Sequence, residues 1–373
     1  MKILWFTWKD KEHPLTGGAE TVNEELAARL VADGHEVIFL VGGFKGCQKE
    51  EIRRGFKIIR VGNRLSVYFE AYKHYQKNLV GWADLVIDEV NTIPFFCKFY
   101  VKEKNIILSY QLCREIWFYQ MIFPLNIIGY LFEPLYLRLL RESYVLTESE
   151  STKADLQKYG FQSDKIFVFP IGLDVKPISE EELNNQKKEA APAILYVGSI
   201  RGMKRPDHLL KAFNILKKEI NDAKLFIIGS GNTKYAQNFF KEVANSQYKD
   251  DITCFGRVDD QQKLEIMRRA HLISVTSVKE GWGLIVTEAA SQGTPAVVYD
   301  IDGLRDACKN NSTGLLTEKN NPQELAQKII QLLQDKNLYA KLRVNAWKDS
   351  LCYNYDNSYK IFVNYLEDIY KKL

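Results

Sequence analysis

Short apolar runs alternate with segments of helical periodicity along most of the chain. The apolar run Lys2–Trp8 is followed by residues 20–33, in which apolar residues recur every fourth position. This spacing places them on one face of an amphipathic helix. The apolar run Val37–Gly42 comes next. A strand, a helix and a second strand in this order predict a βαβ unit, which pairs its strands in a parallel sheet.

The same alternation continues through the rest of the chain and predicts two sheets. Further strand-like runs in the first half lie at residues 84–88, 106–110, 143–147 and 166–170. In the second half they lie at residues 193–198, 224–229, 252–256, 271–275 and 295–299. Helical patterns separate most of these runs, so we expect an α/β protein with two Rossmann-like parallel-sheet domains. Open α/β sheets bind ligands at the carboxyl ends of their strands, and we therefore expect the active site in a central cleft that the two domains face.

The length and one polar stretch predict where the domains meet. A chain of 373 residues is long enough for two domains of ordinary size. Residues 173–190 hold Pro177 and a polar run, which is typical of an interdomain linker. We expect an N-terminal domain over residues 1–173 and a C-terminal domain over 190–350, with a final helix near 355–373 that packs back on the N-terminal domain.

Composition and charge exclude several classes of protein. The chain is 46% hydrophobic and 26% charged, which is ordinary globular usage and excludes a disordered or collagen-like chain. Its net charge is +4, and the most basic run, Lys49–Arg60, interleaves Glu50 and Glu51. We interpret this run as a solvated surface. We expect no nucleic acid among the partners, because binding one needs a concentrated basic face.

The cysteines and the N-terminal run bear on the location of the protein. Six cysteines lie far apart with no C-x-x-C pair, which favours reduced thiols over a zinc cluster or a disulfide framework. The apolar start, Ile3–Trp8, is followed at once by Lys9 and Asp10 and is too short for the core of a signal peptide. We therefore expect a cytoplasmic protein.

The most informative segment is residues 280–288, EGWGLIVTE, between a predicted strand and a predicted helix. Gly281 and Gly283 would let the backbone approach a ligand closely. The N–H groups of Gly283 and Leu284 at the start of the helix would attract an anion, and the helix dipole adds to that attraction. A diphosphate is a suitable ligand for this turn.

Two glutamates flank this turn. Glu288 follows Leu284 by one helical turn, about 6 Å along the axis, which corresponds to the step from a phosphate to its ribose. Its carboxylate could accept hydrogen bonds from ribose hydroxyls, and Glu280, on the other side of the turn, could hold the hydroxyls of a sugar. The alternative is a surface helix whose glutamates are merely solvated.

Three cations lie on the loop after the strand at 193–198. Arg201, Lys204 and Arg205 precede a helix that is predicted to begin near Pro206. When a glycosidic bond to a diphosphate breaks, negative charge grows on the leaving group, and fixed cations in a cleft stabilise that charge. A solvated loop is the alternative interpretation.

Two shorter motifs are less specific. Gly17 and Gly18 lie between the first strand and the first helix, where the backbone can approach a phosphate or an acceptor, or can simply make a tight turn. Asp300 and Asp302 have the D-x-D spacing by which transferases of a different fold bind a divalent ion. Because this spacing is short and ends a buried-looking run, we expect no metal site there.

The segment 280–288 resembles the E-x7-E signature of the retaining glycosyltransferases with the GT-B fold, that is, glycosyltransferase family 4 or glycosyl transferases group 1. Trp282 stands where this family usually has phenylalanine. The resemblance extends over nearly the whole chain, in the family's order. The other matching segments are TGGAE (16–20), TESESTKADLQKYG (147–160), FPIGLD (169–174), LYVGS (195–199), FIIGSG (226–231) and FGRV (255–258).

The resemblance implies an enzyme that transfers a hexosyl group from a nucleoside-diphosphate-sugar to a hydroxyl acceptor with retention of configuration. It implies no metal and no cofactor besides the sugar nucleotide. It also implies an acceptor that is a glycan or a lipid-linked precursor of the cell envelope, as in polysaccharide biosynthesis. The implied catalytic residues are Lys204, Glu280 and Arg201. The implied donor-binding residues are Gly17, Gly18, Ser199, Gly229, Arg257, Val258, Gly281, Gly283, Leu284 and Glu288.

The chain departs from the family pattern at two positions. Ser199 stands where the family has an arginine, and Arg201, two residues later, is a candidate replacement. Tyr110 stands where the family often has a histidine near the donor sugar. The residues expected on the acceptor side are Tyr110, Glu115 and Trp117. These departures leave two other interpretations open, a sugar-nucleotide sensor without catalysis and a sugar-nucleotide epimerase of the same fold.

Residues 116–132, IWFYQMIFPLNIIGYLF, are unusually aromatic. Gln120, Pro124 and Asn126 interrupt the apolar run and disfavour a membrane-spanning helix. Amphipathic aromatic side chains suit a membrane interface, so one interpretation is a surface that docks a lipid-linked acceptor at the inner face of the cell membrane. The other is an ordinary buried helix pair.

Overall fold

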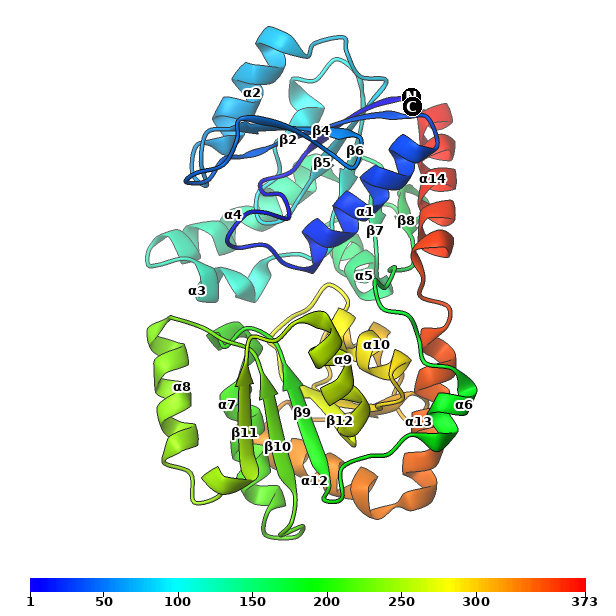
Figure 1. The fold of residues 1–373 in the computed structure, drawn as a ribbon. Helices are drawn as coiled ribbons and strands as arrows, with labels where there is room; N and C mark the ends of the chain where they lie inside the picture. Colours follow the sequence, from blue (N-terminus) through cyan, green and yellow to red (C-terminus); the bar gives the residue numbers. More distant parts are fainter. The chain divides into compact units, whose positions relative to one another are not determined.

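The computed structural model describes residues 1–373 and divides into two compact units. Unit 1 comprises Met1–Gly172 and Asn354–Leu373, and unit 2 comprises Leu173–Tyr353. Each unit holds one sheet whose strands are all or nearly all parallel, with helices packed against it (Figure 1). The predicted α/β fold class with two Rossmann-like sheets is confirmed.

Unit 1 contains an eight-stranded sheet in the order β3-β4-β2-β1-β5-β6-β7-β8, in which only β3 runs antiparallel to its neighbour. The chain starts at β1, builds outward on one side and then returns to β5 on the other side, so the switch point of the sheet lies between β1 and β5. The strands are β1 (Lys2–Phe6), β2 (Glu36–Gly42), β3 (Glu50–Arg53), β4 (Phe56–Val61), β5 (Leu85–Glu89), β6 (Lys104–Leu108), β7 (Val145–Thr147) and β8 (Ile166–Val168). The helices are α1 (Gly18–Ala32), α2 (Val67–Asn78), α3 (Trp117–Gln120), α4 (Leu125–Leu140), α5 (Glu150–Lys158) and α14 (Tyr355–Lys372).

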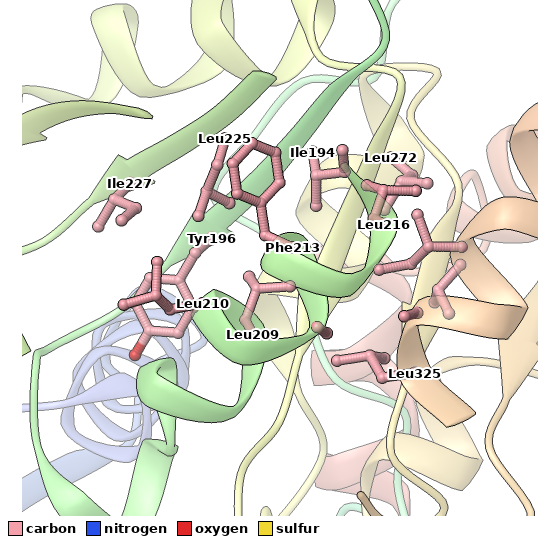
Figure 2. Close-up of a cluster of buried hydrophobic side chains, with 14 of the residues drawn as sticks. Ile194, Tyr196, Leu209, Leu210, Phe213, Leu216, Leu225, Ile227, Leu272 and Leu325 are labelled. Atoms are coloured by element: carbon pink, nitrogen blue, oxygen red, sulfur yellow. The ribbon is translucent and has the colours of Figure 1, made fainter. Parts of the chain in front are cut away.

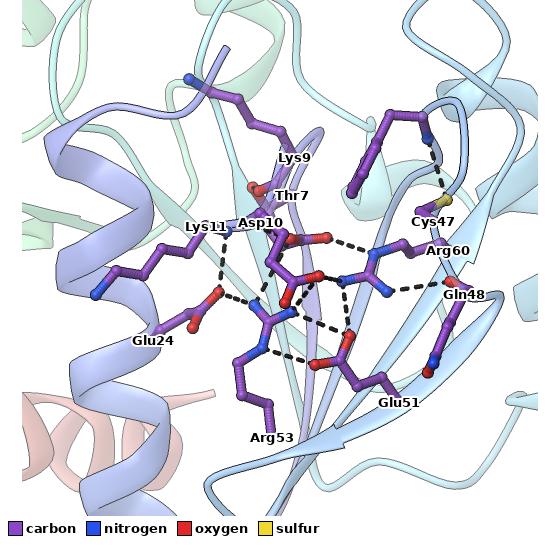
Figure 3. A network of polar contacts seen from close by, with 12 residues as sticks. Thr7, Lys9, Asp10, Lys11, Glu24, Cys47, Gln48, Glu51, Arg53 and Arg60 are labelled. Carbon is purple, nitrogen blue, oxygen red and sulfur yellow. Dashed lines mark hydrogen bonds and ion pairs between the residues drawn. The ribbon is translucent and has the colours of Figure 1, made fainter. Parts of the chain in front are cut away.

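The expectation of a solvated surface over Lys49–Arg60 is wrong for the second half of this run, Phe56–Arg60. The strands β3 and β4 form a hairpin there, and Phe56 is fully buried. Arg60 is only 5% exposed, and its guanidinium donates to Asp10 Oδ2 at 2.7 Å and lies 2.9 Å from Glu51 Oε2 (Figure 3). A charge can be buried when it is paired and hydrogen-bonded. Asp10, which supplies part of the compensating charge, lies 50 residues away in the sequence, so the run itself gave no sign of it.

Unit 2 contains a six-stranded, fully parallel sheet in the order β11-β10-β9-β12-β13-β14. This is the Rossmann order, with the switch point between β9 and β12. The strands are β9 (Ala193–Val197), β10 (Lys224–Ile228), β11 (Ile252–Gly256), β12 (Leu272–Val275), β13 (Ala296–Val298) and β14 (Gly314–Leu316). The helices are α6 (Glu180–Asn185), α7 (Pro206–Leu216), α8 (Lys234–Ala244), α9 (Asp260–Arg269), α10 (Leu284–Ser291), α11 (Leu304–Ala307), α12 (Pro322–Gln334) and α13 (Lys336–Ser350).

The core of unit 2 explains why its central strands read as continuous apolar runs. Ile194 on β9 and Leu225 on β10 are buried together with Leu209 and Phe213 of α7 and Leu325 of α12 (Figure 2). Strands that are covered on both faces need apolar residues at successive positions rather than at alternate ones. The four-residue step from Leu209 to Phe213 places both side chains on the face of α7 that meets the sheet.

The segment that was expected as a linker packs on unit 2. Ile178 and Leu183 form a small apolar cluster with Trp347 of α13, and the N–H of Ile178 donates to the carbonyl of Ser291 at 3.0 Å. The chain therefore passes between the units at Gly172–Leu173 and at Tyr353–Asn354.

The last helix, α14, belongs to unit 1. Its Phe362 is fully buried, with its ring stacked on Trp5 of β1 at a centroid distance of 6.2 Å. The same ring meets Phe169 edge-on at 5.2 Å. At the start of α14, Asp356 forms an ion pair of 2.5 Å with Arg29 of α1.

Candidate active site

Two loops meet at the switch point of unit 2, one after β9 and one after β12. The hydroxyl of Thr276 donates to the carbonyl oxygens of Lys204 at 3.0 Å and of Arg205 at 2.7 Å. The N–H of Val278 donates to the carbonyl of Met203 at 2.8 Å. These bonds hold the loop after β12 against the backbone of the loop after β9. The side chains of the two loops therefore have a defined arrangement.

Lys204 and Glu280 are the charged pair of this junction. Lys204 Nζ lies 2.5 Å from Glu280 Oε1, and the hydroxyl of Ser277 donates to the same oxygen at 2.5 Å. The side chains are 21% and 15% exposed, so both are reachable from solvent. Gly303, which follows β13 with φ +77°, lies against the Glu280 backbone, where a Cβ would come within 2.4 Å of the Glu280 carbonyl oxygen. The structure therefore brings together two of the three expected catalytic residues.

The start of α10 has the shape expected of a phosphate-binding turn. Gly283 caps the helix with φ +100°, and a Cβ there would lie 2.7 Å from Leu304 Cδ2, so glycine is required by both conformation and space. Trp282 is buried and its indole N–H donates to Thr287 Oγ1 at 2.9 Å. The first N–H groups of a helix have no acceptor within the helix. Here the N–H of Val286 already donates to the carbonyl of Gly283 at 2.8 Å, so these groups are those of Leu284 and Ile285.

Glu288 lies one turn further along α10 and has a partner that the sequence did not indicate. Lys263 of α9 places its ammonium 2.8 Å from Glu288 Oε2. Burial raises the pKa of Glu288, and the charge of Lys263 opposes that shift. The side chain is 17% exposed.

The remaining donor-side residues follow the carboxyl ends of β9, β10 and β11. Gly229 approaches the loop after β9 so closely that a Cβ would lie 1.9 Å from the Gly198 carbonyl oxygen. Ser199 is exposed, and its carbonyl accepts a hydrogen bond from the Tyr196 hydroxyl at 3.1 Å. Arg201 is also exposed. The exposed Arg257 and the half-buried Val258 come after β11, two strands from β9.

The D-x-D aspartates are paired with cations of the same unit. Arg305 Nε donates to Asp300 Oδ1 at 2.6 Å, and Lys279 Nζ donates to Asp302 Oδ2 at 2.8 Å. Arg305 also reaches Asp302 Oδ1 at 3.2 Å. No group of three His, Cys, Asp or Glu side chains in the chain has the arrangement of a metal site.

The switch point of unit 1 carries a second charged group beside the first glycine turn. Gly17 and Gly18 are exposed at the start of α1, where the N–H of Gly17 donates to Glu20 Oε2 at 2.6 Å. Lys9, from the loop after β1, lies 3.1 Å from Glu20 Oε1. Lys9 and Glu20 were not expected as site residues, although both lie within ten residues of the glycines.

Tyr110 belongs to a buried chain of hydrogen bonds at the same switch point. Its hydroxyl donates to Asn23 Oδ1 at 2.5 Å, and Asn23 Nδ2 donates to Glu89 Oε2 at 2.7 Å. Glu89 ends β5 and is 1% exposed. Burial, with the nearby charge of Glu20, raises the pKa of Glu89 to about 8. An acidic residue directly after an apolar strand run was the available signal for Glu89, and sequence reasoning did not use it.

The three acceptor-side residues do not form one surface. Glu115 is exposed, whereas Trp117 is 2% exposed and its indole N–H donates to Glu133 Oε2 at 3.0 Å. The Trp117 ring packs on Gly129 of α4, so it joins α3 to α4 and is not open to a substrate. Tyr110 is likewise buried, at 7% exposed. No helix of the chain is both long enough and apolar enough to cross a bilayer.

Two α/β units, each with one sheet of parallel or nearly all parallel strands, are the architecture of the GT-B class. Sucrose-phosphate synthase from Thermosynechococcus elongatus aligns with a TM-score of 0.79 at 17% identity, over 100% of both chains. Anabaena HepE, solved in complex with UDP-glucose, aligns with a TM-score of 0.73 at 16% identity, over 99% of this chain and 100% of HepE. These likenesses show the fold.

Family models then assign both units. Residues 16–176 match Glycosyltransferase Family 4, and residues 178–349 match Glycosyl transferases group 1. The chain belongs to this family of glycosyltransferases, as its motifs predicted.

The curated relatives differ in how much of their length the match covers. Poly(glycerol-phosphate) alpha-glucosyltransferase of Bacillus subtilis is 30% identical over 56% of this chain and 30% of its own length. An uncharacterized glycosyltransferase of Methanocaldococcus jannaschii is 26% identical over 98% of this chain and 97% of its own length. D-inositol 3-phosphate glycosyltransferase of Nocardia farcinica is 26% identical over 54% of this chain and 47% of its own length. The matches thus span less than half of the first and third of these relatives.

Proposed function

We propose that this protein transfers a hexosyl group from a nucleoside-diphosphate-sugar to a hydroxyl of a glycan or lipid-linked cell-envelope precursor, with retention of configuration. The observation that carries the proposal is the Lys204–Glu280 pair, which lies at the switch point of unit 2 beside the glycine-capped start of α10. Membership of the glycosyltransferase family supports the class of reaction. We place the protein in the cytoplasm, at the inner face of the cell membrane.

The donor diphosphate would lie at the start of α10. Its oxygens would accept from the first N–H groups of the helix and from the Lys204 ammonium, and the helix dipole adds to the attraction. Glu280, released in part from Lys204 by the phosphate, would accept hydrogen bonds from sugar hydroxyls. Glu288 would hold the ribose. Lys204 and Glu280 thus act together, one on the leaving group and the other on the sugar that is transferred.

The chemical step needs charge stabilisation on the leaving group. The bond between the anomeric carbon and the phosphate oxygen breaks, and its electron pair stays on that oxygen. The acceptor hydroxyl forms the new bond on the same face of the sugar and passes its proton to the departing phosphate oxygen. Negative charge therefore grows on the diphosphate, where Lys204 is already in place to stabilise it.

We further propose that the reaction is independent of a metal ion. The two aspartates with metal-binding spacing are each neutralised by a cation, Asp300 by Arg305 and Asp302 by Lys279. A divalent ion would have to displace both cations before it could bridge the aspartates and a diphosphate. Turnover in the presence of EDTA that equals turnover with added Mg²⁺ is the expected result, and activity restored only by Mg²⁺ would overturn this part of the proposal.

The donor is tested by thermal unfolding against a panel of UDP-, GDP- and ADP-sugars. A ligand that binds the folded chain raises its stability by RT ln(1 + [L]/Kd), so one nucleotide should raise Tm clearly above the others. The Glu288→Ala variant should lose most of that shift, because Glu288 would hold the ribose, while Glu265→Ala, at an exposed position on α9, should retain it. No shift with any nucleotide sugar would overturn the proposal. Binding without turnover across an acceptor panel would favour the sensor, and donor turnover without acceptor would favour the epimerase.

A further inference from the structure

The outer side of α3 and α4 is apolar and uncovered. Of the 20 large hydrophobic side chains that the chain exposes, 11 lie between residues 118 and 139. Ile122 and Phe123, in the turn before α4, are 78% and 76% exposed, and Leu131 and Phe132 of α4 are about 60% exposed. We call the exposed apolar side chains of residues 118–139 the apolar face. Soluble monomers rarely expose contiguous apolar patches of this kind without a function.

The inner side of the same helices is already packed on unit 1. Tyr136, Leu137 and Leu140 of α4 are buried in the core of the unit. Glu133, also on α4, is 1% exposed and accepts hydrogen bonds from the N–H groups of Cys113 at 2.7 Å and of Arg114 at 2.6 Å. This buried carboxylate and the core contacts fix the orientation of α4. The exposed apolar side chains therefore have no place to bury within unit 1.

The distribution of charge around the apolar face indicates what covers it. Between Ile116 and Leu137 the only charged residue is Glu133, which is buried, so the face presents no charge to solvent. Exposed Arg138 and Arg141 follow at the end of α4.

Two lysines from other elements extend this basic border. Lys165 pairs with Glu142 at 2.9 Å. Lys98 is close enough to Glu142 and Lys165 for both charges to affect its pKa, which burial lowers. Together with the two arginines at the end of α4, four cations therefore gather at that end of the apolar face around the exposed carboxylate of Glu142, and a second exposed carboxylate, that of Glu115, lies just before α3. An apolar surface with a basic border is the pattern of a helix that lies in the interface of an anionic membrane.

We propose that residues 118–141 dock unit 1 on an anionic membrane surface. The apolar face enters the boundary between headgroups and acyl chains, with Ile122 and Phe123 deepest, and Arg138 and Arg141 lie at the level of the lipid phosphates. A helix of 16 residues, about 24 Å long, lies in the plane of the interface and does not cross it. A two-fold pair of copies is disfavoured, because such an interface uses the same patch twice and would bring both basic borders together.

This docking deepens the proposed function, since it would bring the enzyme to a lipid-linked acceptor, but its test does not depend on activity. The full chain is co-sedimented with phosphatidylcholine vesicles that contain or lack phosphatidylglycerol, at low and at high salt. We expect binding to the anionic vesicles that weakens with salt. The double variant Ile122→Ser/Leu131→Ser should partition at least tenfold less, and Arg138→Glu/Arg141→Glu should lose the preference for phosphatidylglycerol.

A matched control separates this surface from any other exposed apolar residues. Leu65 and Phe69 are 82% and 59% exposed on another part of unit 1, so Leu65→Ser/Phe69→Ser should bind vesicles like the unchanged chain. Donor-induced thermal shifts should be the same in all variants. A chain that stays in the supernatant with anionic vesicles at low salt would overturn the proposal. A second outcome would also overturn it: the chain does not bind vesicles but forms a concentration-dependent dimer, and Ile122→Ser/Leu131→Ser abolishes that dimer. The apolar face would then be covered by a second copy of the chain.

Discussion

Lys204 Nζ and Glu280 Oε1 lie 2.5 Å apart, although 76 residues separate them in the chain. They meet because β9 and β12 are neighbours in the sheet, and each residue follows one of these strands. The pair places a cation and a carboxylate beside the start of α10, where a diphosphate and a sugar would each find a partner of suitable charge.

Substitution of Lys204 tests its role on the leaving group. We expect Lys204→Ala to lower kcat by about 10²–10³, the usual cost of removing one donor that stabilises charge in a transition state. Donor KM should change less, because the charge on the diphosphate grows only as the glycosidic bond breaks. Initial rates over a range of donor concentrations measure both constants. Lys211→Ala on α7 is the control, and an equal loss in both variants would contradict a specific role for Lys204.

Substitution of Glu288 tests the ribose contact. Glu288→Ala should chiefly raise donor KM and leave kcat near its original value, because binding the ribose stabilises ground state and transition state alike. Glu288→Gln keeps one hydrogen-bond acceptor, so its donor KM should lie between that of the unchanged chain and that of Glu288→Ala. Glu265, exposed on α9, supplies the control Glu265→Ala. Unchanged KM in Glu288→Ala would refute the assignment.

Substitution of Gly283 tests the cap of α10, with substitution of Gly34 as its control. Gly283→Ala introduces a residue with φ +100° and a Cβ only 2.7 Å from Leu304 Cδ2, so we expect a loss of about 1–3 kcal/mol in the free energy of unfolding together with weaker donor binding. Gly34 has a similar φ of +84° with nothing within 4 Å of a Cβ. Gly34→Ala should therefore lose less stability and no affinity. Equal effects of the two substitutions on donor affinity would speak against a phosphate contact at α10.

Glu89 predicts a specific dependence of stability on pH. Its pKa is raised from 4.5 to about 8 by burial, so between these values the folded chain holds a proton that the unfolded chain has lost. The free energy of unfolding contributed by this group therefore falls as pH rises through that window. Glu89→Gln has no proton to lose, and its stability relative to the unchanged chain should rise from pH 5 to pH 8.

Urea unfolding at pH 5, 6.5 and 8 measures this difference. Glu70→Gln, on α2 with its side chain 40% exposed, is the control and should show no such trend. A stability difference for Glu89→Gln that is the same at all three pH values would mean that Glu89 is ionised throughout.

Most strands of both sheets were predicted from their apolar runs, including the edge strands β8 and β11. Runs such as Lys224–Ile228 and Leu272–Val275, which are β10 and β12, stand out because parallel central strands carry consecutive apolar residues. β3, β4 and β14 were missed. β3 is a polar edge strand, Glu50–Arg53, and β14 spans only Gly314–Leu316, whereas β4, Phe56–Val61, has its apolar residues interrupted by Lys57 and Arg60 and was interpreted as part of a solvated basic run. Edge position and shortness both weaken the periodic signal.

The site was predictable where a motif lies in one segment and unpredictable where partners come from distant ones. The glycine turn of 280–288 was visible, because its residues adjoin one another. The pairing of Glu288 with Lys263, and of Tyr110 with Asn23, depends on packing between elements. The sequence also could not decide whether the apolar side chains of α4 are buried or exposed, because an apolar run suits a core and an interface equally.

The central claim is that a sugar nucleotide binds at the switch point of unit 2. The most direct test is a crystal structure of the chain soaked with the nucleoside diphosphate that stabilises it most. We expect the diphosphate oxygens within hydrogen-bond distance of the first N–H groups of α10 and of Lys204 Nζ, with the ribose at Glu288. Density for the nucleotide anywhere else, with the Lys204–Glu280 pair untouched, would contradict the account.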